Sequence, residues 1–139
     1  MSASLEALLQ VRPDAPAMAR DAISQLEGVL DPQLLEDLRL VTSELVTNAV
    51  RHGGRVSDLL LRVDARATLV LVEVEDGGPG FVPVYPPEPG ERSGWGLCLV
   101  DRLAERWGVA VGGVGTKVWA ELPVRGLVRG LDGSAVEVG

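Results

Sequence analysis

Hydrophobic residues in the middle of the chain recur at helical spacing and predict one long amphipathic helix over residues 32–51. Asp31 precedes Pro32, which is typical of a helix start because Asp caps free backbone N–H groups and Pro fits the first turn. Gly53 and Gly54 follow the periodic stretch and predict its end. The apolar stripe that faces the core consists of Leu34, Leu35, Leu38, Val41, Thr42, Leu45, Val46 and Ala49.

Two strands are predicted after this helix, over residues 58–63 and 68–75, because both are rich in Leu and Val. Successive side chains of a strand point to opposite faces. The three alternate valines of the second strand therefore share one face, and Asp76 leaves the strand on the same side. We expect this face to be buried, which makes an aspartate at its end unusual.

The other segments complete an alternation of helices and strands. They are an edge strand at 5–11, a helix at 15–30, a Gly- and Pro-rich loop at 76–93, a helix at 94–107, and two closing strands at 109–111 and 116–122. This order favours an α+β fold, a two-layer sandwich of one mixed or antiparallel sheet with helices on one face. We expect a single domain over residues 1–123 and a flexible C-terminal tail over 124–139.

The chain has 139 residues and a formal net charge of −7, from 13 Lys and Arg against 20 Asp and Glu. An acidic surface disfavours direct binding to nucleic acid and to anionic membranes, because both carry the same sign of charge. Cys98 is the only cysteine and His52 the only histidine, which excludes an internal disulfide and a two-histidine metal site. The first residues lack a signal-like apolar run, so we expect a cytoplasmic protein without a membrane segment.

Two polar residues on the long helix are candidates for chemistry. Glu44 and Asn48 are four residues apart and therefore neighbours on the helix surface, at the edge of the apolar stripe. A glutamate at such a border can act as a base, and an asparagine oxygen can bind a hard cation such as Mg²⁺. The alternative is an ordinary polar flank, because pairs with this spacing are common on helices.

Glycine-rich segments mark three further places. Asp76 begins the run Asp-Gly-Gly-Pro-Gly, in which glycines allow close approach of a ligand and a buried carboxylate needs a donor such as a purine amino group. The alternative is a simple Asp-Gly turn. Residues 93–97, Ser-Gly-Trp-Gly-Leu, begin a predicted helix whose free N–H groups suit a phosphate. Gly115 and Thr116 precede the last strand and are uninformative alone.

The order of these segments resembles the four ATP-site motifs of the Bergerat-fold superfamily, which includes gyrase-type ATPases, heat-shock chaperones and sensor histidine kinases. The resemblance covers residues 15–123. The run at 43–53, Ser-Glu-Leu-Val-Thr-Asn-Ala-Val-Arg-His-Gly, is similar to that of the small serine/threonine kinases that act as anti-sigma factors. The four motifs are Glu44-Leu-Val-Thr-Asn48-Ala49, Asp76-Gly-Gly-Pro-Gly80, Gly94-Trp-Gly96-Leu97 and Gly115-Thr116.

The resemblance implies a role for each of these residues. Glu44 would be the catalytic base, and Asn48 would bind Mg²⁺. Asp76 would accept a hydrogen bond from the adenine amino group, with Thr116 supporting the adenine end. Residues 81–93 would form an ATP lid. The remaining positions would lie along the nucleotide and its phosphates, and they are Gly78, Gly80, Gly94, Gly96 and Leu97.

The resemblance also implies an ATP-dependent protein serine/threonine kinase of the anti-sigma type, with ATP and Mg²⁺ as cofactors. Such a protein would bind a sigma factor and phosphorylate an anti-anti-sigma antagonist, and a homodimer is compatible with it. The alternative is a non-catalytic module in which ATP switches a protein interaction. A detached histidine-kinase domain is disfavoured because no helical pair carries an acceptor histidine. A gyrase-like ATPase is disfavoured because no transducer domain follows Pro123.

Overall fold

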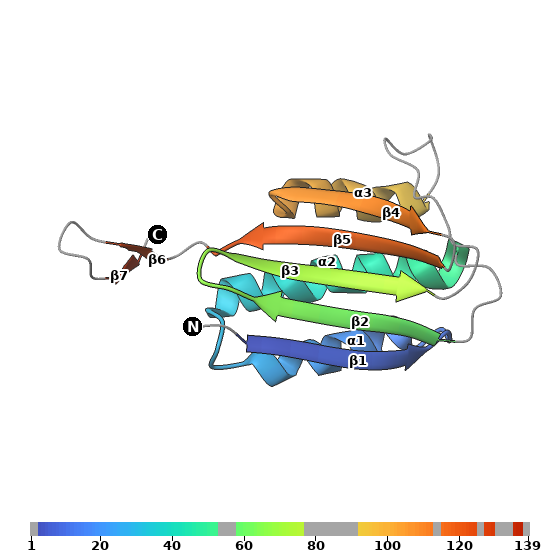
Figure 1. Ribbon diagram of the computed structural model, residues 1–139, viewed down its shortest axis with the longest axis horizontal. Coiled ribbons are helices and arrows are strands. Elements are labelled where there is room, and N and C mark those ends of the chain that lie inside the picture. Colours follow the sequence, from blue (N-terminus) through green and yellow to red (C-terminus); the bar gives the residue numbers. More distant parts are fainter. Residues whose placement is uncertain are drawn as a thin grey trace.

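The computed structural model describes residues 3–52, 58–76, 92–112, 115–124, 127–129 and 135–137. Figure 1 shows how the elements are arranged. In chain order they are β1 (Ala3–Gln10), α1 (Ala15–Ile23), a 3₁₀ turn η1 (Ser24–Leu26), α2 (Pro32–His52), β2 (Asp58–Ala65), β3 (Leu69–Asp76), α3 (Arg92–Leu103), β4 (Arg106–Gly112), β5 (Gly115–Pro123), β6 (Leu127–Arg129) and β7 (Ala135–Glu137).

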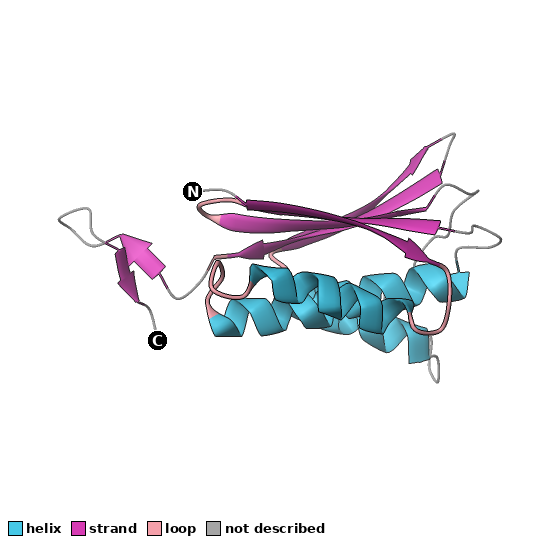
Figure 2. Ribbon diagram, turned by 90° about the horizontal axis from the view of Figure 1, so that it is seen from below, coloured by secondary structure: helices cyan, strands magenta, loops and turns pink. Residues whose placement is uncertain are grey.

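Five strands form one sheet in the order β1-β2-β3-β5-β4, and every neighbouring pair is antiparallel. The three helices all cover the same face of this sheet (Figure 2). The predicted α+β two-layer sandwich is therefore confirmed, and the sheet is antiparallel rather than mixed. The edge strand expected near the N-terminus is β1, which lies at the end of the strand order and pairs with β2.

The core lies between the sheet and α2. The valines at positions 70, 72 and 74 of β3 are fully buried, as are Leu38, Val41 and Leu45 of α2. Along β3 buried side chains alternate with partly exposed ones. This alternation confirms the predicted inner face, on which Asp76 is the last residue.

Helix α2 begins where the sequence predicts, because Asp31 caps its first turn. The Asp31 Oδ1 atom accepts the backbone N–H groups of Gln33 at 3.0 Å and of Leu34 at 3.1 Å. These are two of the donors that a helix start leaves without an internal partner. The cap therefore fixes the start of the helix that carries Glu44 and Asn48.

Two predicted helices are shorter in the structure than in the sequence-based expectation. The helix expected over 15–30 ends at Ile23, continues as η1 and reaches a turn in which Gly28 has a φ of 82°. The helix expected over 94–107 ends at Leu103, and Trp107 lies on β4. Trp107 pairs with Ala120 of β5, so long-range strand pairing overrides its helical spacing from Leu103.

The C-terminal segment contains a small sheet of its own. Strands β6 and β7 pair antiparallel, with Val128 opposite Val136. The flexibility expected for residues 124–139 and the domain bound at 123 stay predictions. No helix within the described ranges is both long enough and apolar enough to cross a membrane.

The helix-free face of the sheet carries a row of alternating charges. Arg62 Nε donates to Glu6 Oε1 at 2.8 Å, and Arg62 Nη1 lies 3.9 Å from Glu73. Lys117 Nζ lies 3.3 Å from the same Glu73 carboxylate. The hydrogen bond with Glu6 raises the pKa of Arg62. Because solvent reaches Glu6, Arg62 and Lys117 and screens their charges, we expect each pair to stabilise the fold by at most about 1 kcal/mol.

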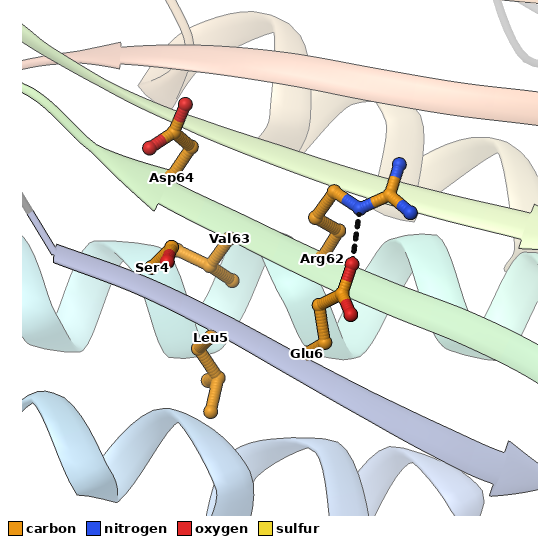
Figure 3. Close-up of a pocket in the computed structure, with 6 residues that line it drawn as sticks. All are labelled: Ser4, Leu5, Glu6, Arg62, Val63 and Asp64. Atoms are coloured by element: carbon orange, nitrogen blue, oxygen red, sulfur yellow. Dashed lines mark hydrogen bonds and ion pairs between the residues drawn. The ribbon is translucent and has the colours of Figure 1, made fainter.

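An open pocket of about 510 Å³ lies on the same face, over β1 and β2. Figure 3 shows the Arg62–Glu6 hydrogen bond within it. The pocket is on the other side of the sheet from α2 and α3, so it does not involve any candidate site residue. Its lining residues are Ser4, Leu5, Glu6, Arg62, Val63 and Asp64.

Two tryptophans lie near each other in the sheet but belong to opposite faces. The indole of Trp119 lies across Gly108, where an added Cβ would be 2.9 Å from the Trp119 Cζ2 atom. Gly108 is directly opposite Trp119 in the ladder between β4 and β5. Trp107 precedes Gly108 on β4, so its side chain points to the other face, where it packs against the core.

Thr42 offers a test of the core, because its hydroxyl is fully buried and has no hydrogen-bond partner among the described residues. A buried hydroxyl without a partner costs stability. We expect Thr42→Val to raise the free energy of unfolding by about 1 kcal/mol in urea titrations. The matched control is Val46→Thr on the same helix, which should lower it. A loss of stability in Thr42→Val would show that the hydroxyl has a partner.

Candidate functional site

Helix α2 lies between α1 and α3 and contacts both (Figure 1). Arg39 Nη2 donates to Ser24 Oγ and to Glu27 Oε1, both at 2.9 Å. Arg20 Nη1 of α1 donates to Ser43 Oγ at 2.8 Å. These bonds hold the flank of α2 that carries Arg39 and Ser43 against α1 and η1.

Glu44 and Asn48 lie on the opposite flank of α2. At 3.6 residues per turn, Asn48 is about 180° around the helix from Arg39, which turns it toward α3. Asn48 is only 3% exposed, and its Nδ2 atom makes no hydrogen bond with the described part of the chain. Glu44 is half-buried one helical turn earlier. The predicted pair therefore shares one flank, at the border of the core.

Asp76 and Thr116 are held side by side by the ladder between β3 and β5. They are register partners, and the backbone N–H of Thr116 donates to Asp76 Oδ1 at 3.3 Å. Asp76 is 2% exposed and Thr116 is 1% exposed. The Thr116 hydroxyl has no hydrogen-bond partner among the described residues. The Asp76 carboxylate, the Thr116 hydroxyl and the Thr116 backbone N–H group thus lie in a part of the fold that solvent hardly reaches. Polar groups in such a place need hydrogen-bond partners.

The predicted motifs converge at one end of the molecule. Figure 1 shows that α2 ends, β3 ends, β5 begins and α3 begins at the same end of the sheet. Residues 94–97 form part of the first half of α3. Gly78 and Gly80 lie outside the described residues, as does most of the expected lid at 81–93.

The described residues include no group of three or more His, Cys, Asp or Glu side chains that could hold a metal ion. Asn48 offers one amide oxygen at the border of the core. Mg²⁺ commonly takes one or two protein ligands and completes its shell with substrate oxygens and water. The Asn48 oxygen would therefore be a single protein ligand for a magnesium ion that arrives with a polyphosphate.

Two features of the site have no clear signal in the sequence. One is the backbone N–H of Thr116, which orients the Asp76 carboxylate and depends on strand register. The other is a hydrogen bond from Trp107 Nε1 to Asp101 Oδ1 at 3.0 Å, which joins β4 to α3. The sequence pattern predicts Trp107 on the helix and gives Asp101 no role, so it does not indicate this bond.

The sequence of this chain matches a known protein family and several curated relatives. A family model described as a histidine kinase-like ATPase domain matches residues 5–122. The anti-sigma F factor of Pasteuria penetrans is 36% identical over 104 residues, and the match covers 65% of this chain and 69% of that protein. The anti-sigma F factor of Clostridium acetobutylicum is 31% identical over 117 residues, and the match covers 73% of this chain and 80% of that protein.

Solved structures share the fold. The structure of the RsbU and RsbW domains of Rv1364c from Mycobacterium tuberculosis matches with a TM-score of 0.66 and 22% identity. The match covers 86% of this chain and 32% of that one, so the chain spans about a third of that protein. The histidine kinase domain of the Erythrobacter litoralis EL346 blue-light activated histidine kinase matches with a TM-score of 0.55, at 24% identity over 83% of this chain and 61% of that one.

Proposed function

The chain belongs to the family of histidine kinase-like ATPase domains, and from this membership we propose that it is an ATP-dependent protein serine/threonine kinase that acts as an anti-sigma factor. The resemblance identified from the four motifs is confirmed at the level of the family. ATP binding follows from the family, and anti-sigma F factors are among the relatives. The kinase activity, the metal and the residue roles belong to the proposal.

The observation that best supports the proposal is a set of buried polar groups at the end of the sheet where the motifs converge. Asn48 Nδ2 on α2 and the Thr116 hydroxyl on β5 have no hydrogen-bond partner in the described structure, and Thr116 lies beside the buried Asp76. A fold keeps such groups in its interior at a cost to stability, which a polar ligand offsets. An adenine nucleotide carries donors and acceptors at one end and charged oxygens at the other, so it suits this set.

We assign the adenine end to Asp76 and Thr116. The Thr116 backbone N–H bonds Oδ1, which fixes the orientation of the carboxylate. Asp76 Oδ2 then accepts the adenine amino group, and the Thr116 hydroxyl supports the ring, directly or through water. Gly78 and Gly80, outside the described residues, would let the chain pass close to the nucleotide.

We assign the phosphate end to Asn48 and the start of α3. Asn48 would ligate Mg²⁺, which neutralises phosphate charge and orients the terminal phosphate when bound. Helix α3 begins at Arg92, so the N–H groups that its start leaves unpaired are those of residues 92–95. Among the assigned residues, Gly94 would offer its N–H group to the phosphates, and Gly96 and Leu97 would lie next to it along the helix.

Glu44 would act as the general base. It accepts the proton of a serine or threonine hydroxyl of the partner while that oxygen bonds to the γ-phosphorus. The bond from the γ-phosphorus to the oxygen that bridges to the β-phosphate breaks, and ADP leaves. Most of the rate enhancement would come from positioning, because phosphoryl transfer requires little covalent chemistry from the protein.

The proposed partners are a sigma factor and an anti-anti-sigma antagonist protein, the second being the phosphate acceptor. A homodimer is part of the proposal as well. We place the protein in the cytoplasm, where ATP and the transcription machinery are available. The net charge of −7 favours protein partners with basic surfaces over direct contact with nucleic acid.

The adenine assignment predicts the effect of Asp76→Asn. Since the Thr116 N–H group bonds one oxygen, the new amide would turn its NH₂ group toward the purine, and two donors would face each other. We expect ATP affinity to fall about tenfold or more in calorimetric titrations, while inosine triphosphate, which has an acceptor there, loses less. Glu75→Gln, on the exposed face of the same strand, is the control. Unchanged ATP affinity in Asp76→Asn would remove Asp76 from this role.

The base assignment predicts that Glu44→Gln retains ATP affinity and loses phosphoryl transfer by about a hundredfold or more. The measurement is transfer of labelled γ-phosphate to the purified antagonist. The control is Glu36→Gln, an exposed residue of the same helix. If the unmodified chain binds ATP but labels nothing, the non-catalytic switch replaces the kinase.

The metal assignment predicts a magnesium-dependent effect of Asn48→Ala. ATP affinity should fall about tenfold or more with Mg²⁺ present, and much less with a chelator in its place, because only the metal-bound form uses the amide oxygen. Thr47→Ala, at the neighbouring half-buried position, serves as the control. Equal losses with and without Mg²⁺ would contradict a ligand role for Asn48.

A further inference from the structure

We propose that Asp101 and Trp107 form an anchor that positions α3 for phosphate binding, an inference that rests on the proposed function. The Trp107 Nε1–H group donates to Asp101 Oδ1 at 3.0 Å. Asp101 lies in the last turn of α3, and Trp107 lies at the start of β4. The bond therefore ties the C-terminal end of the helix to the sheet.

Other contacts also hold this end of α3, which packs against α2 and places Leu103 against the core. Val100 is fully buried, and its carbonyl accepts the backbone N–H of Ala104 at 2.8 Å. The next backbone N–H, that of Glu105, donates to Glu121 of β5 at 2.7 Å. These contacts fix where the chain leaves the helix. The side-chain bond of Asp101 adds a fixed point on the helix surface, and together with the packing on α2 it sets how α3 is rotated about its axis.

Because a helix is rigid, its rotation at Asp101 also sets the orientation of the proposed phosphate site at its other end. Leu97 is four residues before Asp101 and Gly94 is seven before it, so the three positions follow one side of α3. They span about 10 Å of a rigid helix, at 1.5 Å per residue. A rotation at Asp101 would therefore turn the backbone of the first turns by the same angle, and hydrogen bonds to phosphate weaken steeply when they are misaligned.

Trp107 is suited to this role by its position in the sheet. It is paired with the buried Ala120, and its ring packs against the core beside the helices. A large planar ring has few rotamers, so its N–H group is directed with little freedom. Asp101 and Trp107 are positioning residues, because they act on the nucleotide through the helix.

The test compares ATP with adenosine, which lacks the phosphates. In Trp107→Phe and in Asp101→Leu, we expect ATP affinity to fall about three- to tenfold, the range of one hydrogen bond, while adenosine affinity stays within about twofold. Asp101→Asn keeps the acceptor oxygen and should restore ATP binding. The matched control is Trp119→Phe, on the opposite face of the sheet. Asp101 is exposed, so Asp101→Leu tests the bond without opening the core.

The possible results distinguish a failure of the anchor from a failure of the proposed function. Selective loss of ATP affinity with rescue by Asp101→Asn supports the anchor. Unchanged ATP affinity in both variants overturns it, as does a parallel loss of ATP and adenosine, which would indicate a general structural role. If the unmodified chain binds neither ligand, the proposed function fails, and the anchor fails with it.

Discussion

The site depends on one constraint, the burial of the Asp76 carboxylate at the end of β3. A charge in a nearly dry environment is tolerated only when donors are built around it. The ladder between β3 and β5 supplies such a donor, because its register places the Thr116 backbone N–H beside Oδ1. A slip of one residue would send either side chain to the solvent-facing side of the sheet. The regular hydrogen bonding of two central strands is therefore a condition for the proposed adenine contact.

Much of the fold could be predicted from hydrophobic periodicity alone. The stripe on α2 and the alternation along β3 are strong signals because each side chain's burial follows directly from its place in the repeat. Trp107 shows where this reasoning ends. Its spacing from Leu103 suits a helix, yet pairing with Ala120 of β5 places it on a strand. That pairing joins residues far apart in the sequence, and no local pattern encodes it.

The candidate site could be predicted less completely. The sequence identified Glu44, Asn48, Asp76 and Thr116, and the structure brings Asp76 and Thr116 together while it places the first two on one flank of α2. The choice of flank depends on how Arg39 and Arg20 hold the other side against α1 and η1. Such contacts cross between elements, so periodicity does not show them. The bond between Trp107 and Asp101 escaped prediction for the same reason.

Asn48 and Thr116 have polar atoms that lack partners in the described structure, and these atoms affect how stable the protein is in the cell. A ligand that satisfies them binds the native state and not the unfolded chain, so each rise in its free concentration adds to the free energy of unfolding. Starvation would then empty the proposed nucleotide site and enlarge the fraction of molecules that unfold and become accessible to proteases. The abundance of such a regulator would follow the energy supply of the cell, even without a change in its synthesis.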